Sequence, residues 1–169
     1  MGIKEYRYTP RAIDRRALWV TLACAAAAVI AFLLSFLLPV YGGLVQLFSL
    51  ALLVVALFVA YKFLWVSYTY MITDPGDGIP CLLVEQTMGR RSSLLCRLPL
   101  YAILRILPAG AAAPAGKAYV YTASMWGGPY RYLTGRMEGN AVLLKLEGDD
   151  AFFAALSDAV AAVKQEKDD

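Results

Sequence analysis

The side chains that could do chemistry in this 169-residue sequence do not form a catalytic set. The chain contains no histidine, the residue whose ordinary pKa suits proton transfer near neutral pH. A Ser-His-Asp or Cys-His site therefore cannot be built. Asp149 and Asp150 are adjacent carboxylates, but they stand before an apolar helical run and are interpreted as helix-start residues. The sequence predicts that the protein is not an enzyme.

Metal and cofactor sites are not predicted either. Cys24, Cys81 and Cys96 have no CxxC spacing, and without histidine they cannot form the usual kinds of zinc site. We expect them to be small apolar packing residues. Residues 74–85 begin and end with an acid, as a calcium-binding loop does, but glycines occupy the third and fifth positions, where ligands are needed. We therefore expect no metal and no cofactor.

Four tyrosines are candidates for binding a partner. Tyr119 and Tyr121 are two residues apart, as are Tyr130 and Tyr132, so each pair shares one face of a predicted strand. We interpret the four rings as one aromatic face that forms a candidate partner surface. Packing of the rings in the core is the alternative.

Two adjacent arginines form the other candidate. Arg90 and Arg91 are the only paired basic residues after the apolar part of the chain, and they follow Gly89 in a predicted tight turn. Contact with an anionic group, either a lipid headgroup or an acidic partner, is one interpretation. A pair of solvated turn residues is the alternative.

These residues belong to a chain whose N-terminal half is too apolar for an ordinary soluble domain. The hydrophobic fraction is 60%, the mean hydropathy is +0.56, and no Asp, Glu, Lys or Arg lies between Arg16 and Lys62. Since one span needs about 20 apolar residues, the run predicts two transmembrane helices, at about 17–38 and 44–65, within a hairpin over 17–66. The turn is Pro39–Gly43. A hairpin buried in a soluble core is the alternative, but the remaining chain is too short to cover it.

Basic residues predict the orientation of this hairpin. The leader, residues 1–16, holds five basic and two acidic side chains, whereas the turn holds none. The positive-inside rule then places the N-terminus in the cytoplasm, and two spans return the C-terminus to the same side. A cleavable signal peptide is the alternative for the first span, although its apolar stretch is longer than the usual h-region. We expect a multi-pass plasma-membrane protein with both ends in the cytoplasm.

Small residues recur at four-residue spacing along the predicted spans. Such residues let helix backbones approach closely in lipid, either within the hairpin or between protomers. The general frequency of alanine is the alternative explanation. The candidate helix–helix seam consists of Ala23, Ala27, Ala31, Ser35, Ala56 and Ala60. Because no ionisable residue lies at depth in either span, a pore or carrier is not predicted.

Short alternating runs bounded by turn residues replace the apolar pattern after residue 66, which predicts a β-rich cytosolic domain over 67–164. An amphipathic helix at about 149–164 ends this domain, and a charged tail follows at 165–169. One face of the helix should carry Phe152, Leu156, Ala159, Val160 and Val163. The expected strands are 67–73, 80–88, 92–98, 102–107, 117–123, 129–137 and 140–147, with a turn at Glu138–Asn140 before the last.

Charge excludes one class of partner. Residues 66–169 hold ten basic and eleven acidic side chains, so they offer no basic domain that could grip nucleic acid. The partners that we expect are the lipid bilayer and either a protein partner or a second copy of the chain.

Seven short strands followed by one amphipathic helix resemble the pleckstrin-homology-like (PH-like) plan. The chain resembles bacterial membrane proteins that join two transmembrane helices to a cytosolic PH-like domain, a largely uncharacterised group. The segments that carry the resemblance are YTYMIT, LLVEQTMGRRSSLLCRLPL and LLKLEGDDAFFAALSDAV. The resemblance implies a membrane α-helical hairpin plus an α+β cytosolic domain, built as a seven-strand β-barrel or sandwich with a C-terminal helix.

The sequence departs from this family at one loop. PH domains that bind phosphoinositides carry basic residues after their first strand, whereas the corresponding loop here, Asp74–Pro80, is acidic. We expect a non-catalytic, membrane-anchored interaction or scaffold module of the bacterial inner membrane that binds a protein partner or lipid headgroups through its cytosolic domain. The alternative is an accessory subunit of a transporter or envelope-stress complex that acts through its transmembrane helices.

Overall fold

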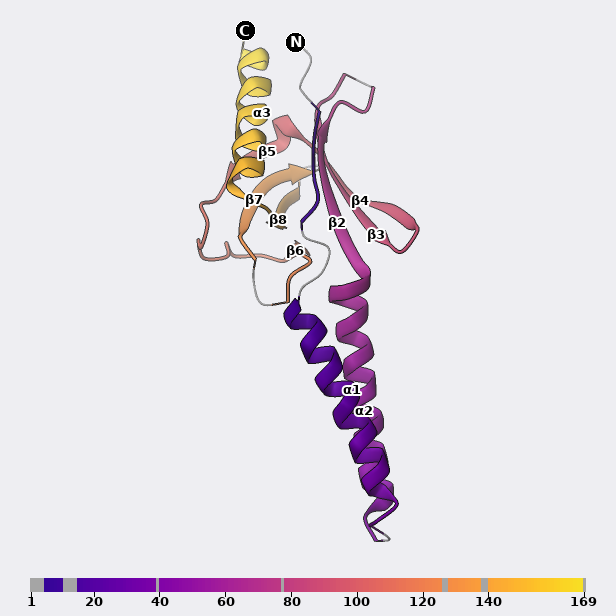
Figure 1. Cartoon of the computed structure of the whole chain (residues 1–169). Coiled ribbons are helices and arrows are strands. Elements are labelled where there is room, and N and C mark those ends of the chain that lie inside the picture. The colour runs from indigo at the N-terminus through magenta and orange to yellow at the C-terminus, as the bar shows by residue number, and fades with distance from the viewer. Residues whose placement is uncertain are drawn as a thin grey trace. The chain divides into compact units, whose positions relative to one another are not determined.

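The computed structural model describes residues 5–10, 15–38, 40–76, 78–125, 128–137 and 140–168 (Figure 1). The chain divides into a helical unit, Arg11–Val66, and a β unit made of Met1–Pro10 and Ser67–Asp169. Some predicted features lie outside the described residues. They are Lys4, Arg11 and Asp14 of the leader, Pro39 of the hairpin turn, Asp77 of the acidic loop, Glu138 and Gly139 of the last turn, and Asp169 of the tail.

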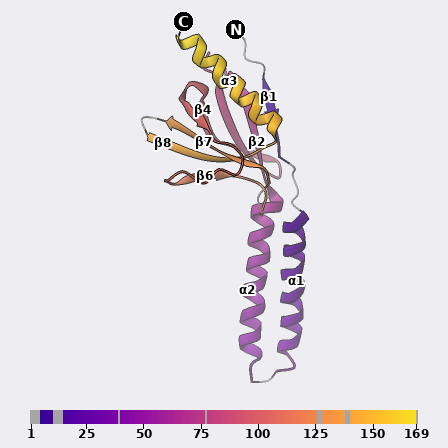
Figure 2. The same cartoon turned by 90° about the vertical axis from the view of Figure 1, so that its left-hand side faces the viewer.

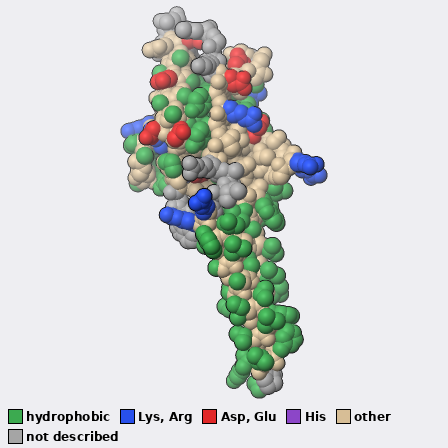
Figure 3. Space-filling view, in the orientation of Figure 1, with side chains coloured by type: hydrophobic (Ala, Val, Ile, Leu, Met, Phe, Trp, Pro, Cys, Tyr) green, Lys and Arg blue, Asp and Glu red, His purple; other side chains and the backbone are tan. Residues whose placement is uncertain are grey.

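The helical unit is a pair of apolar helices joined by a short turn. Helix α1 spans Arg15–Ser35, and α2 spans Gly42–Ala60 and continues as the π-helix η1 over Tyr61–Trp65. Both α1 and the stretch Gly42–Trp65 are long and apolar enough to cross a membrane. The helices run side by side in Figures 1 and 2, and hydrophobic side chains cover their visible face in Figure 3. The prediction of two apolar helices of spanning length is thus confirmed.

Small residues on α1, and small residues alternating with Val and Leu on α2, line the contact between the two helices. Buried and half-buried residues recur along each helix at intervals that alternate between three and four residues. They include Ala17, Thr21, Cys24, Ala28, Ala31 and Ser35 on α1, and Gly42, Val45, Ser49, Leu52, Ala56 and Val59 on α2. This mean spacing of about 3.5 residues keeps a contact row on one side of each helix in a left-handed pair.

Polar side chains also join the two helices. The Ser49 hydroxyl donates a buried hydrogen bond of 2.8 Å to the carbonyl oxygen of Ala28. The amide nitrogen of Gln46 donates to the Ser35 hydroxyl over 3.3 Å. At Gly42 the helices are so close that a Cβ atom would lie 2.7 Å from the Ser35 carbonyl oxygen. Glycine therefore fits this position because any side chain would press on the neighbouring backbone.

The predicted seam residues divide between two sides of the hairpin. Ser35, Ala56 and Ala60 are buried and Ala31 is half-buried, whereas Ala23 and Ala27 are exposed and lie outside the contact row. Four residues turn an α-helix about 40° past a full revolution, so a strict four-residue row drifts off any one face. The hairpin follows the alternating spacing instead.

The β unit contains two four-stranded sheets among its described residues. Sheet 1 has the order β1-β2-β3-β4, and sheet 2 has the order β5-β7-β8-β6. The strands of sheet 1 are β1 (Tyr6–Tyr8), β2 (Val66–Thr73), β3 (Cys81–Met88) and β4 (Arg91–Pro99). After the 3-10 turn η2 (Leu100–Ala102) come β5 (Ile103–Ile106), β6 (Ala118–Tyr121), β7 (Tyr130–Met137) and β8 (Asn140–Glu147).

The strand β1 corrects the predicted leader. Residues 1–16 were predicted to be a basic cytosolic leader, but within them Tyr6–Tyr8 forms a strand that pairs antiparallel with β2. Tyr8 stands opposite Tyr70, and the hydroxyls of Thr9 and Thr69 lie 3.1 Å apart. The β unit is therefore built from both segments that flank the helices, and the hairpin is an insertion between its first and second strands.

The predicted α+β character is confirmed, and each of the seven predicted strands occurs within about two residues of its expected bounds at either end. The eighth is β1. Of the predicted barrel or sandwich, a closed barrel is not formed, because among the described residues the two sheets form separate hydrogen-bonded ladders. The chain passes from the first sheet to the second through η2, which lies between β4 and β5.

Helix α3 (Asp150–Asp168) covers the core of the β unit. It lies across the strands in Figure 2. Its predicted inner face is confirmed, because Phe152, Leu156 and Val160 are buried and Ala159 and Val163 are half-buried against the core. The fully buried partners of these residues include Tyr70, Ile72, Leu82, Leu98, Leu133, Leu144 and Leu146.

The start of α3 is fixed by the two predicted carboxylates. Asp149 is the N-cap, since its Oδ1 accepts a hydrogen bond of 2.8 Å from the Phe152 amide. Asp150 begins the helix and pairs with the Arg131 guanidinium at 2.6 Å. Both acids thus have structural partners.

Candidate functional site

Two of the predicted surface tyrosines lie on β6, at the end of sheet 2. Tyr119 stands beside Leu144 of β8 and Tyr121 beside Leu146, and both leucines are buried in the core. Because neighbours in register share a face of a sheet, the two rings lie on the core side. Tyr121 is half-buried there and packs against the ring of Tyr68 at a centroid distance of 6.1 Å.

The other two tyrosines lie on the opposite face of sheet 2. Tyr130 and Tyr132 of β7 stand opposite Glu147 and Lys145 of β8. The two rings meet edge to face with centroids 5.7 Å apart, and the Lys145 ammonium lies 3.8 Å from the centre of the Tyr130 ring. The four rings therefore do not form the single aromatic face that we expected. Tyr119 and Tyr121 lie on the core side of sheet 2. Tyr130 and Tyr132, on the other side, make cation–π contacts with Lys145 of the same chain.

Among the residues that the structure describes, the strand β6 forms an open edge of sheet 2. It pairs with β8 on one side and is last in the order of the sheet. Tyr119 is 50% exposed and Val120 is 52% exposed, so this edge presents apolar side chains to its surroundings. No charged residue lies within Ala118–Tyr121. A short uncharged edge strand of this kind can pair with an extended segment of another chain.

A network of hydrogen bonds fixes the end of this edge. Oε2 of Glu147 accepts from the backbone amides of Ala123 (2.8 Å) and Ser124 (3.0 Å). The Tyr70 hydroxyl donates to the carbonyl oxygen of Tyr121 and accepts from the Glu147 amide over 3.3 Å. Burial raises the pKa of the Tyr70 hydroxyl well above its ordinary value, so the hydroxyl keeps the proton that it donates. These hydrogen bonds connect the end of β6 to β2 of sheet 1 and to β8 of sheet 2.

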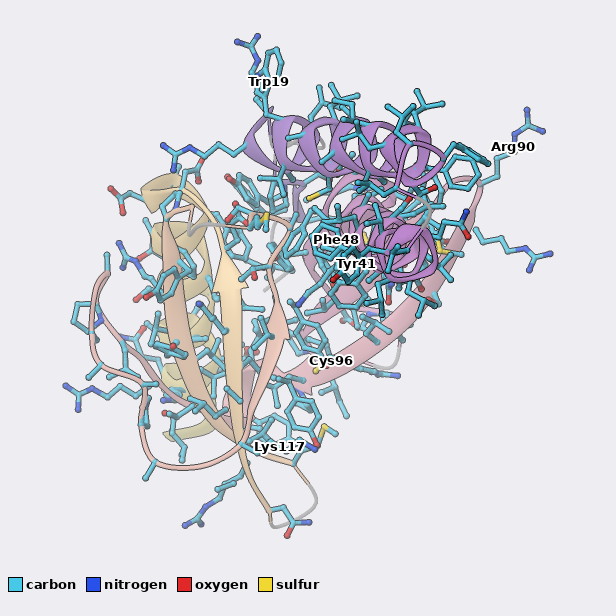
Figure 4. The ribbon with its side chains drawn as sticks, turned by 90° about the horizontal axis from the view of Figure 1, so that it is seen from below. Trp19, Tyr41, Phe48, Arg90, Cys96 and Lys117 are labelled. Carbon is cyan, nitrogen blue, oxygen red and sulfur yellow. The ribbon has the colours of Figure 1, made fainter. Side chains whose placement is uncertain are left out.

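The paired arginines lie at the end of the β3–β4 ribbon. Met88 pairs with Arg91, which leaves Gly89 and Arg90 as a two-residue turn, and Gly89 has the positive φ of 60° that such turns require. Both arginine side chains are exposed, and in Figure 4 Arg90 points away from the ribbon. The predicted tight turn is confirmed.

The outer half of the β4 strand in this ribbon is exposed on both faces. Every residue from Arg91 to Leu95 is exposed, whereas Cys96 and Leu98 are buried. A β-bulge separates the halves: Val84 pairs with Cys96 but Glu85 pairs with Leu94, so Leu95 is an extra residue. Bulges increase local twist and bend a strand, which turns the outer half of the ribbon away from the core.

Several residues of these surfaces were not predicted as site residues. The adjacent Leu94 and Leu95 interrupt the period-two pattern of β4, and that interruption is the signal from which a bulge could have been predicted. Lys145 and Glu147 carry no signal of their own, because their partners come from other strands and depend on the register of sheet 2.

Titratable and metal-ligating side chains are the remaining groups of the described residues. Among the described residues, no three His, Cys, Asp or Glu side chains gather as metal ligands would, and Cys81 and Cys96 are buried thiols. Burial raises the pKa of the Cys96 thiol, which makes it a poor nucleophile. No protein-family model matches the chain, and a search of curated protein sequences finds no match.

Proposed function

We propose that the chain is a membrane-anchored, non-catalytic interaction module of a bacterial plasma membrane. Its apolar hairpin anchors a PH-like β unit at the cytoplasmic face, and the β unit binds a protein partner. The observation that carries the proposal is the pairing of β1 with β2, because it makes one folded unit from the segments on both sides of the hairpin. Anchoring keeps this unit near membrane partners and raises its effective concentration toward them.

The pairing of β1 with β2 also supports a topology with both ends on one side. Two strands of one sheet cannot lie on opposite sides of a bilayer, so α1 and α2 together must cross it an even number of times. The basic residues before α1 and at its first two positions, Arg15 and Arg16, favour the cytoplasm as that side.

The strand order supports the PH-like assignment. Sheet 1 has four neighbouring strands, β5, β7 and β8 form an antiparallel meander, and α3 packs on the core between them. An arrangement of seven strands and one helix of this kind supports the proposal of a PH-like plan. In this assignment β6, which runs parallel to β8, is an addition at the edge of the second sheet.

The partner surface in this proposal is the open edge at β6. An extended segment of a partner protein would extend sheet 2 through main-chain hydrogen bonds, and the exposed Tyr119 and Val120 would contact its side chains. Of the four tyrosines that the sequence suggested as a partner surface, only Tyr119 is part of this one. Tyr121 is half-buried, and the Tyr130–Tyr132 pair contacts Lys145.

Photo-cross-linking in native membranes tests the proposal. A photoreactive amino acid at Tyr119 should give a discrete adduct with one protein, and Val120→Arg should reduce the adduct at least tenfold. A matched control is Leu104, which is 56% exposed on the other edge strand of sheet 2, β5. An adduct of equal yield from Leu104, or none from Tyr119, would contradict a partner at β6.

A second candidate function has one observation in its favour. Ala23 and Ala27 are small, lie in a predicted span and are exposed on the hairpin. An accessory subunit that assembles through its helices would use such positions for close packing in lipid. The variant Ala23→Leu/Ala27→Leu should then release the chain from its complex, whereas Val29→Leu/Ile30→Leu, at exposed apolar positions, should not. Retention of the complex in both variants would leave the β6 edge as the binding surface.

A further inference from the structure

The outer half of the β3–β4 ribbon combines two cations with exposed apolar side chains. Arg90 and Arg91 are exposed, and among the described residues neither has a carboxylate partner. Beside them Met88 is 43%, Leu94 is 53% and Leu95 is 40% exposed. Water solvates the arginines well but not the three apolar side chains. A surface that suits both kinds of group is the interface of a bilayer, where apolar groups meet acyl chains and guanidinium groups meet phosphates.

The direction of the strands determines at which end of sheet 1 this ribbon end lies. Strands β2 and β3 are neighbours joined by only seven residues. A parallel connection needs a dozen or more, so β3 runs back along β2. The β3–β4 turn therefore lies at the end of sheet 1 where β2 begins, and β2 begins at Val66, directly after Trp65 ends the spanning stretch. No linker separates the strand from the helix.

Local charge favours an anionic surface. From Val66 onward the chain is nearly neutral, yet the ribbon end carries adjacent arginines and only Glu85 as an acid within Glu85–Leu95. On the β4 side of this end every residue from Arg91 to Leu95 is exposed, so side chains on both faces of the strand can reach a surface outside the β unit. From these observations we infer that the end of the β3–β4 ribbon docks on the anionic lipid surface of the bilayer that holds the hairpin. This inference rests on the proposed membrane anchoring and adds a second contact to it.

Hydrogen–deuterium exchange of the full chain in lipid nanodiscs tests the docking. Exchange of the amides over 86–95 is compared in phosphatidylcholine alone and with added phosphatidylglycerol. Each arginine near an anionic surface contributes to the free energy of docking. Together the two arginines should raise the docking equilibrium constant about 30-fold in the anionic lipid. We expect exchange in this segment to slow in the anionic nanodiscs, and high salt to reverse the slowing because it screens charges.

Two double variants separate specific docking from general charge. Arg90→Gln/Arg91→Gln should abolish the slowing, whereas Arg105→Gln/Arg136→Gln removes the same charge from exposed arginines of sheet 2 and should preserve it. Equal exchange in both lipids, or slowing that the control pair also abolishes, would overturn the inference. Slowing that requires an added acidic protein in place of anionic lipid would overturn it as well.

Failure of docking can be told apart from failure of anchoring. Co-elution of the chain with nanodiscs reports on the hairpin and does not depend on Arg90 or Arg91. A chain that co-elutes but shows no lipid-dependent exchange refutes docking alone, and a chain that does not co-elute refutes the membrane anchor.

Discussion

Tyr8 and Tyr70 stand opposite each other in the antiparallel strands β1 and β2, although both apolar helices lie between them in the sequence. Their rings are stacked with centroids 6.3 Å apart, and the Tyr8 ring also stacks on Phe152 of α3 at 5.1 Å. This contact fastens the segment before the hairpin to the core of the β unit.

Replacement of the Tyr8 ring should destabilise the β unit. Tyr8→Ala removes two aromatic contacts from a half-buried position, and we expect the free energy of unfolding to fall by about 1–3 kcal/mol. Unfolding of the full chain in detergent, followed by near-ultraviolet circular dichroism, measures this loss. Arg7→Ala, at an exposed position of the same strand, should stay within about 0.5 kcal/mol of the parent. Equal stability of the two variants would mean that β1 does not contribute to the core.

Adjacent glycines at the start of α2 should respond differently to the same change. Gly42→Ala would place a Cβ atom 2.7 Å from the Ser35 carbonyl oxygen, whereas at Gly43 nothing lies within 4 Å. We expect Gly42→Ala to weaken the helix pair by about 1–3 kcal/mol through overpacking, with Gly43→Ala close to neutral. Unfolding of the helical unit in mixed micelles gives the comparison. A larger loss from Gly43→Ala would show that the helices approach each other elsewhere.

The Glu147 carboxylate should hold the segment after β6 in place. Glu147→Ala removes the acceptor of two backbone hydrogen bonds, and bonds to a charged group contribute about 1.5–3 kcal/mol each. We expect the amides of Ala123 and Ser124 to exchange with solvent at least tenfold faster. Glu85→Ala, which removes a carboxylate from the β3–β4 ribbon, serves as the control and should leave these amides unchanged. Unchanged exchange in Glu147→Ala would contradict the network.

Alkaline pH should unfold the β unit through Tyr70. Burial raises the pKa of this hydroxyl above its ordinary value near 10, so the protonated form is favoured in the folded state. The resulting stability is complete below about pH 10 and is lost as pH rises toward the folded pKa, by about 1.4 kcal/mol per pH unit. Stability curves between neutral pH and the alkaline limit should be flatter for Tyr70→Phe. Identical slopes would indicate that Tyr70 is not the titrating group.

The features that the sequence alone could predict are those with a local cause. The apolar run between Arg16 and Lys62 determines two helices whatever surrounds them, and alternation of apolar residues determines strands such as β8. The capping role of Asp149 is equally local, since it depends on one amide three residues away.

The features that could not be predicted depend on contacts far apart in the chain. A three-residue strand such as Tyr6–Tyr8 has too little pattern to detect, and its partner lies beyond both helices. Period two placed Tyr119 with Tyr121 and Tyr130 with Tyr132 correctly. It could not relate the pairs to each other, because the register of β6 and β7 is set by β8 between them.

The insertion of the hairpin between β1 and β2 has a consequence for biogenesis. During synthesis β1 leaves the ribosome first and has no partner until the helices and then β2 have followed. On the proposed topology, a chain whose helices fail to enter the bilayer as a pair would keep β1 and β2 apart and leave Phe152 without the Tyr8 ring against it. The β unit would therefore fold completely only in chains whose two helices have inserted correctly, and the unfolded β unit of the other chains would be accessible to proteases.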